Sequence, residues 1–187
     1  MVRLFLSVIV AIGVLTNGYS QTDSAPVHVF EQTDKGSHLA GGTISVANQF
    51  STSTSTNAFT ANLNPNYGYF FANNFALGGV LSLAYSKQEG GASSQNAILS
   101  PFVRYYIGPP KTFMIFGYAS AGAGINVNNT KNVGLFDYKV GPGADFFVNK
   151  HVAFEALLTY NGNKMLNTPG AQYTNIVSLL IGLQVFF

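Results

Sequence analysis

The segment at residues 65–85 contains a stretch in which large apolar side chains alternate with small or polar ones. The large row consists of Phe75, Leu77, Gly79, Leu81, Leu83 and Tyr85. The residues between them are Ala76, Gly78, Val80, Ser82 and Ala84. Strict alternation predicts a β-strand, because successive side chains leave opposite faces. A soluble barrel has bulky apolar groups inside. Here they are predicted to point outward, with an aromatic at each end of the row, as in a strand that crosses a bilayer.

The composition supports a protein whose surface does not face water alone. Charged residues make up 9% of the 187-residue chain, against roughly 25% in ordinary soluble domains. The net charge of +2 provides no basic field for nucleic acid, and the absence of cysteine excludes disulfides and thiolate metal sites. Beyond the N-terminal region, no apolar run is long enough to span a bilayer as a helix. A membrane protein with this sequence must therefore be a closed barrel.

The N-terminal residues 1–20 have the form of a secretory signal peptide. Arg3 supplies a positive start, residues 4–15 form an apolar run, and small residues stand at Gly18 and Ser20, after which cleavage is expected. The apolar run is too short for a spanning helix. Residues 21–35 are polar and irregular, and we predict a short periplasmic leader there. The barrel domain is predicted to occupy residues 36–187.

Seven further segments repeat the alternation of residues 75–85 and are also predicted to be strands. The clearest is 133–148, where Phe136, Tyr138 and Val140 alternate with Asp137 and Lys139. The least polar inner row belongs to residues 112–125, with Met114, Phe116 and Tyr118. The remaining predicted strands lie at 38–50, 59–71, 97–107, 151–160 and 174–187.

Short turns and longer polar loops alternate between the predicted strands. Turns are expected near Asn73, Pro110 and Asn149, and loops at 51–57, 88–95, 126–132 and 161–172. Single-chain outer-membrane barrels have an even number of strands, short periplasmic turns and longer external loops. The sequence therefore predicts an all-β fold: an eight-stranded antiparallel up-and-down transmembrane β-barrel with both termini on the periplasmic side.

One hairpin motif occurs three times. Its copies are Pro65 with Tyr69-Phe70-Phe71, Pro101 with Tyr105-Tyr106-Ile107, and Pro142 with Phe146-Phe147-Val148. Each copy is followed by a turn and another alternating strand, as expected of the hairpin unit in an up-and-down barrel. Proline has no ladder donor. Three prolines in one register therefore predict a bulge or weakened pairing at a common height.

On these motifs the chain resembles the small outer-membrane β-barrel proteins of Gram-negative bacteria, of the OmpA-like membrane-domain kind. The opening at residues 35–42 (KGSHLAGG), the repeated hairpins and the terminal Phe187 are especially like the Bacteroidetes-type versions. The resemblance covers roughly residues 35–187. It implies insertion by the barrel-assembly machinery, with the aromatic end of the last strand at Phe187 as part of the assembly signal.

Five charged residues fall on predicted inward positions. An eight-stranded barrel has an interior just wide enough for side chains to fill, so charges there are desolvated and must pair. We expect an internal network that closes the lumen, with Arg104 paired to Asp145 or Glu155. In the alternative, the same residues line a narrow ion path. The set is Arg104, Asp137, Lys139, Asp145 and Glu155.

The sequence offers no catalytic or metal-binding constellation. His28, His38 and His151 are scattered, and no serine in the strand that holds His151 and Glu155 could join them in a catalytic site. The histidine spacing matches no ligand motif. We therefore expect neither an enzyme nor a cofactor.

The sequence thus predicts an integral protein of the outer membrane of a Gram-negative bacterium. Its expected role is structural or at the cell surface, with a closed or nearly closed polar lumen. Membrane lipid is the expected partner, nucleic acid is not, and a monomer is expected. One alternative is a porin-like pore for small solutes. A second is a secreted soluble barrel that binds an apolar ligand, which requires the inward and outward rows to be exchanged.

Overall fold

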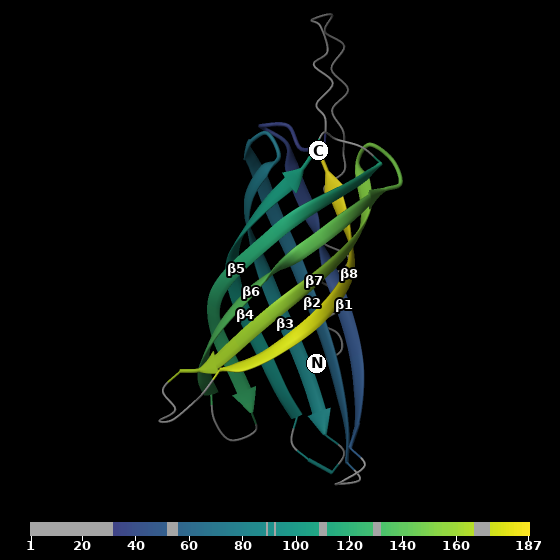
Figure 1. Cartoon of the computed structure of the whole chain (residues 1–187). Helices are drawn as coiled ribbons and strands as arrows, with labels where there is room; N and C mark the ends of the chain where they lie inside the picture. Colours follow the sequence, from purple (N-terminus) through teal and green to yellow (C-terminus); the bar gives the residue numbers. More distant parts are fainter. Residues whose placement is uncertain are drawn as a thin grey trace, which may run out of the picture.

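The computed structural model describes residues 32–51, 56–88, 90–91, 93–108, 112–128, 132–166 and 173–187. Each strand pairs antiparallel with the next, and the last pairs with the first to close a barrel (Figure 1). This confirms the predicted eight-stranded antiparallel barrel. Within the described residues, no helix is long and apolar enough to cross a membrane. The strands are β1 (His38–Ser51), β2 (Thr56–Ala72), β3 (Phe75–Gln88), β4 (Ser93–Ile107), β5 (Phe113–Asn128), β6 (Asn132–Phe147), β7 (Val152–Met165) and β8 (Thr174–Phe186).

The two faces of the barrel wall are those that the alternation predicts. The large apolar residues lie outside, and Leu99 on β4 and Val177 on β8 are 65% and 67% exposed. The neighbours of Leu99 on β4, Ile98 and Ser100, are buried. The inward row of β5, which was the least polar in the sequence, is also buried as predicted. It consists of Met114, Phe116 and Tyr118.

Strands extend further than predicted at one end of the barrel. We call the end with the β2–β3, β4–β5 and β6–β7 connections the turn end, and the opposite end the loop end. At the loop end β2 begins at Thr56, β4 begins at Ser93, β5 ends at Asn128 and β7 ends at Met165. The predicted limits were 59, 97, 125 and 160. Alternating hydrophobicity marks the lipid-facing band alone, whereas backbone pairing continues through the Asn- and Ser-rich residues beyond it.

The three repeated prolines interrupt the hydrogen-bond ladder without shifting its register. Toward the following strand, pairing lapses at residues 64–65 of β2, 100–101 of β4 and 141–142 of β6, and then resumes in the same register. Proline has no N–H to donate there. The predicted weakening is confirmed, and none of these sites is a bulge. On the preceding strand each proline faces a glycine, in the pairs Gly42–Pro65, Gly79–Pro101 and Gly117–Pro142.

The described end of the predicted leader packs against the β2–β3 turn. The Thr33 hydroxyl donates to Asn74 Oδ1 at 2.6 Å, and the Lys35 amide donates to Asn73 Oδ1 at 2.9 Å. Asn74 has a positive φ of 64°, which asparagine tolerates better than most residues. Its amide donates to the Thr33 carbonyl at 2.8 Å. Residues 32–37 are thus attached to the barrel. The predicted signal peptide and the rest of the leader lie outside the described residues.

Candidate functional site

Aromatic side chains fill the barrel interior at the turn end. The ring centroids of Phe147 and Phe186 are 4.9 Å apart, and those of Tyr106 and Phe116 are 5.1 Å apart. Phe70 joins the two pairs, at 5.8 Å from Tyr106 and 6.3 Å from Phe186. All five rings are buried. Because they come from β2, β4, β5, β6 and β8, this aromatic plug spans the lumen.

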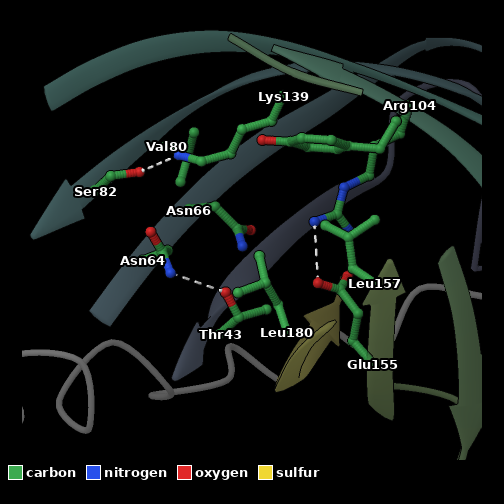
Figure 2. Close-up of a pocket in the computed structure, with 11 residues that line it drawn as sticks. Thr43, Asn64, Asn66, Val80, Ser82, Arg104, Lys139, Glu155, Leu157 and Leu180 are labelled. Atoms are coloured by element: carbon green, nitrogen blue, oxygen red, sulfur yellow. Dashed lines mark hydrogen bonds and ion pairs between the residues drawn. The ribbon is translucent and has the colours of Figure 1, made fainter. Parts of the chain in front are cut away.

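Next to the aromatic plug, an ion pair crosses the lumen between Arg104 on β4 and Glu155 on β7 (Figure 2). Arg104 Nη1 donates to Glu155 Oε2, and Nη2 lies 3.4 Å from Oε1. The two residues are 2% and 1% exposed. The guanidinium also lies over the rings of Phe116 at 4.8 Å and Phe102 at 5.3 Å. Pairing offsets the desolvation of the buried charges, and the ring faces add cation–π attraction.

A second carboxyl group lies beside this ion pair. Asp145 on β6 is the cross-strand neighbour of Glu155 and is fully buried. The Tyr106 hydroxyl donates to Asp145 Oδ2 at 2.6 Å. Asp145 Oδ1 has no hydrogen-bond partner among the described residues. The guanidinium of Arg104 therefore shares its surroundings with two acidic groups, and the phenol of Tyr106 holds the second one in place.

Lys139 and Asp137 form a second ion pair on the inner face of β6. Lys139 Nζ lies 3.0 Å from Asp137 Oδ1. Lys139 Nζ also donates to Ser82 Oγ on β3 at 2.9 Å (Figure 2). The two residues are two positions apart on one strand, so their side chains share a face. Asp137 is buried and Lys139 is half-buried. The contact with Ser82 directs the ammonium group across the interior.

Neutral polar side chains line the interior toward the loop end. Amide groups donate to hydroxyl groups across strands, as Asn64 does to Thr43 at 3.2 Å and Asn161 to Ser178 at 2.9 Å. A small pocket lies between this lining and the ion pair of Arg104. Its polar walls include Thr43, Asn64, Asn66, Lys139, Arg104 and Glu155 (Figure 2).

The structure places all five predicted charged residues in the interior and brings Arg104 to Glu155. The sequence reasoning missed their neutral partners. Tyr106 was part of the repeated hairpin motif but was not linked to Asp145, and Phe116 and Ser82 were not linked to the cations. One signal for these contacts was present in the sequence: the inward aromatic row of β5 belongs to the strand that follows β4, which carries the inward Arg104. The stagger between neighbouring strands decides which aromatic ring lies against which charge. The alternation of apolar and polar residues along a strand carries no information about that stagger.

The two histidines in the described part of the chain each contact a different partner. His38 Nδ1 lies 2.7 Å from the Tyr67 hydroxyl, and His151 Nδ1 lies 2.9 Å from the Phe186 carbonyl. Glu155, predicted to share a strand with His151, is instead in the ion pair with Arg104. In the part of the chain that the structure describes, no three His, Asp or Glu side chains are grouped so as to hold a metal ion. His28 lies outside that part.

Comparison with known proteins gives a likeness in fold. No protein-family model matches the sequence, and no curated protein matches it. The structure is similar to Neisserial surface protein A at 10% identity, over 81% of this chain and 96% of that one, with a TM-score of 0.55. It also matches the outer membrane protein OprG from Pseudomonas aeruginosa at 16% identity, over 84% and 99% of the two chains, with a TM-score of 0.49. The likeness to Neisserial surface protein A shows that the chain has the fold of a small outer-membrane barrel.

Proposed function

We propose that this protein is an integral barrel of the Gram-negative outer membrane with a closed lumen and a structural or surface role. The apolar exterior supports its place in lipid. Large apolar side chains are exposed on all eight strands, including Ile44, Leu77, Leu99, Ile115, Leu158 and Ile181. Such a surface is unfavourable in water and suits a hydrocarbon layer.

Aromatic side chains flank this apolar surface at both ends. Tyr69 and Tyr105 are exposed near the turn end, and Phe59 and Tyr160 are exposed toward the loop end. Outer-membrane barrels carry such aromatic girdles at the two membrane–water interfaces. We infer that the girdles delimit the membrane-spanning band of this chain.

The observation that carries the closed lumen is the aromatic plug with the Arg104–Glu155 pair beside it. Arg104 and the ring of Phe116 contact each other inside the barrel, and both are almost unexposed. An eight-stranded barrel leaves little room beyond its side chains. The surface role would fall to the loops, of which residues 52–55, 89, 92, 129–131 and 167–172 lie outside the described residues.

The cation-containing pocket favours a second candidate function, a pore for small solutes. Lys139 is half-buried at a pocket lined by polar residues such as Asn64 and Asn66 and by apolar ones such as Val80 and Leu157. A pore would need the aromatic plug to open. The soluble-barrel alternative requires apolar groups inside and polar groups outside, and the exposed Leu99 and Val177 run against it.

The assembly role of the C-terminal residue remains part of the proposal. The Phe187 amide donates to the His38 carbonyl at 3.0 Å, and the His38 amide donates to the Phe187 carbonyl at 2.6 Å. The last residue therefore meets the first strand where the barrel closes. We infer that Phe187 is part of the segment that the barrel-assembly machinery reads. The repeated proline hairpins support kinship with the OmpA-like, Bacteroidetes-type barrels.

Cell fractionation tests the membrane proposal. We expect the protein in the outer-membrane fraction, resistant to a urea wash, and with faster gel migration before heating than after it. Recovery in the soluble periplasmic fraction would contradict the proposal. Cleavage at Ser20 is tested on the same material by sequencing the mature N-terminus.

A further inference from the structure

The seam between β1 and β8 closes along only part of its length. Its register pairs run from Leu39–Phe186 to Ile44–Ile181. In the same register Ser45 would face Leu180, but no further pair forms along the described lengths of the two strands. Both strands stay in the sheet, since β1 pairs with β2 as far as Ser51, and β8 pairs with β7 as far as Thr174. Toward the loop end β1 and β8 diverge (Figure 1). We call residues 45–51 of β1 and 174–180 of β8 the open edges.

The inner part of the open edges lies within the apolar band. On β8, Val177 and Leu179 continue the outward apolar row and are among the most exposed residues of the barrel. Val177 pairs with Tyr160 on β7, so the edge from 177 to 180 lies on the membrane side of that outer aromatic. On β1, Val46 is likewise outward and exposed, and residue 48 faces Phe59. Residues 45–47 thus also lie inside the girdle.

Unpaired strand edges are not tolerated in hydrocarbon, because lipid tails cannot satisfy backbone N–H and C=O groups. The hydrocarbon outside the edges offers no such partners, whereas another strand offers a full row of them. The open edges match each other in register, since residues 45–51 and 174–180 would pair completely if brought together. They carry no charged residue. The sequence that fits each edge is therefore present in a second copy of the same chain.

We propose that two copies of this chain join in the membrane through their open edges. The β1 edge of each copy pairs antiparallel with the β8 edge of the other, around a two-fold axis along the membrane normal. This isologous arrangement satisfies all four edges and extends the β1–β8 ladder that each copy already contains. It departs from the monomer expected from the sequence. The inference rests on the proposed insertion into the outer membrane.

The test is a disulfide cross-link between differently tagged copies. The chain has no cysteine, so Val46→Cys in one copy and Leu179→Cys in the other are the sole thiols when the two are co-expressed. The shared register places position 46 of one copy opposite position 179 of the other. Facing strand residues lie within the roughly 4.4–6.8 Å Cα separation that a disulfide needs. We expect oxidation to convert a large part of the protein into a heterodimer that carries both tags.

A matched control uses Leu99→Cys and Ala123→Cys in separate copies. These residues face each other across the β4–β5 ladder on the outer surface, away from the seam, and should give no heterodimer. Equal cross-linking of the control overturns the proposal. So does the absence of the 46–179 heterodimer. A further test places Val46→Cys and Leu179→Cys in the same chain. An intrachain disulfide without dimer would show that the seam closes within one copy, and it would overturn the proposal. Heat-modifiable migration and outer-membrane recovery of every variant separate these outcomes from failed insertion.

Discussion

Arg104 and Glu155 are 51 residues apart in the chain, yet their side chains form a buried ion pair across the lumen. The pair links β4 to β7, strands that do not touch in the wall of the barrel. It therefore acts as a cross-brace as well as an obstruction. Its neighbours are aromatic faces and a second carboxyl group, and both side chains are buried, so the loss of one partner leaves a desolvated charge.

Glu155→Gln should destabilise the barrel strongly, because it leaves the buried Arg104 guanidinium without its counter-charge. We expect a loss of about 3–5 kcal/mol in the free energy of unfolding, measured by urea titration in lipid vesicles. The double variant Arg104→Met/Glu155→Leu removes both charges and should recover most of that loss. A Glu155→Gln protein as stable as the wild type would show that the pair does not brace the barrel.

Tyr106→Phe removes one hydroxyl and leaves a buried oxygen of Asp145 without its donor. The expected loss in the free energy of unfolding is about 1–3 kcal/mol. Tyr105→Phe is the matched control, since Tyr105 is the next residue and points outward. It should change stability little. Equal effects of the two variants would argue against the role assigned to the Tyr106–Asp145 hydrogen bond.

Gly78 and Gly79 test the inward and outward faces with neighbouring residues. A Cβ at Gly78 would lie 2.5 Å from the Phe102 ring and 2.2 Å from the Tyr67 carbonyl, whereas a Cβ at Gly79 meets nothing within 4 Å. Gly78→Val should cost about 1–3 kcal/mol or prevent folding. Gly79→Val should insert and fold normally, as judged by heat-modifiable migration. The reverse order would mean that the two faces have been exchanged.

Pro101→Ala should repair a gap in the ladder between β4 and β5. The register places position 101 opposite Ala121, and pairing resumes at Phe102–Ser120. The new amide at position 101 is expected to donate to the Ala121 carbonyl. Hydrogen-bond scalar coupling between these groups in the NMR spectrum would detect the bond. A spectrum without that coupling, in a folded barrel, would show that the gap has a cause other than the missing N–H.

The barrel topology followed from residues whose environment differs between the two faces. The difference in polarity between neighbours such as Leu81 and Ser82, or Tyr138 and Lys139, assigns one face to lipid and the other to the lumen. Eight strands with this alternation determine the fold class. The strand ends at the loop end could not be located this way. Polar residues such as Asn161 and Asn163 are found both in water-exposed strands and in loops, and here they pair with β6. The polarity of side chains at this end indicates that they face water, whereas the position of the strand end depends on backbone hydrogen bonds.

The charged interior was visible in the sequence, but its partners were not. Arg104 and Glu155 each stood out as an inward charge that required a counter-charge. The choice of Glu155 over Asp145 depends on the stagger of β4 against β7, which sums the register of three intervening pairs. The half-closed β1–β8 seam depends on strand divergence at the loop end and has no counterpart in the residue pattern.

Conductance in planar lipid bilayers tests the central claim, the closed lumen, most directly. Purified, heat-modifiable protein should insert and leave the membrane current at its baseline over a wide range of voltage, because the aromatic plug and the Arg104–Glu155 pair fill the interior. Discrete, reproducible current steps from the wild-type protein would contradict that claim and identify the chain as a pore.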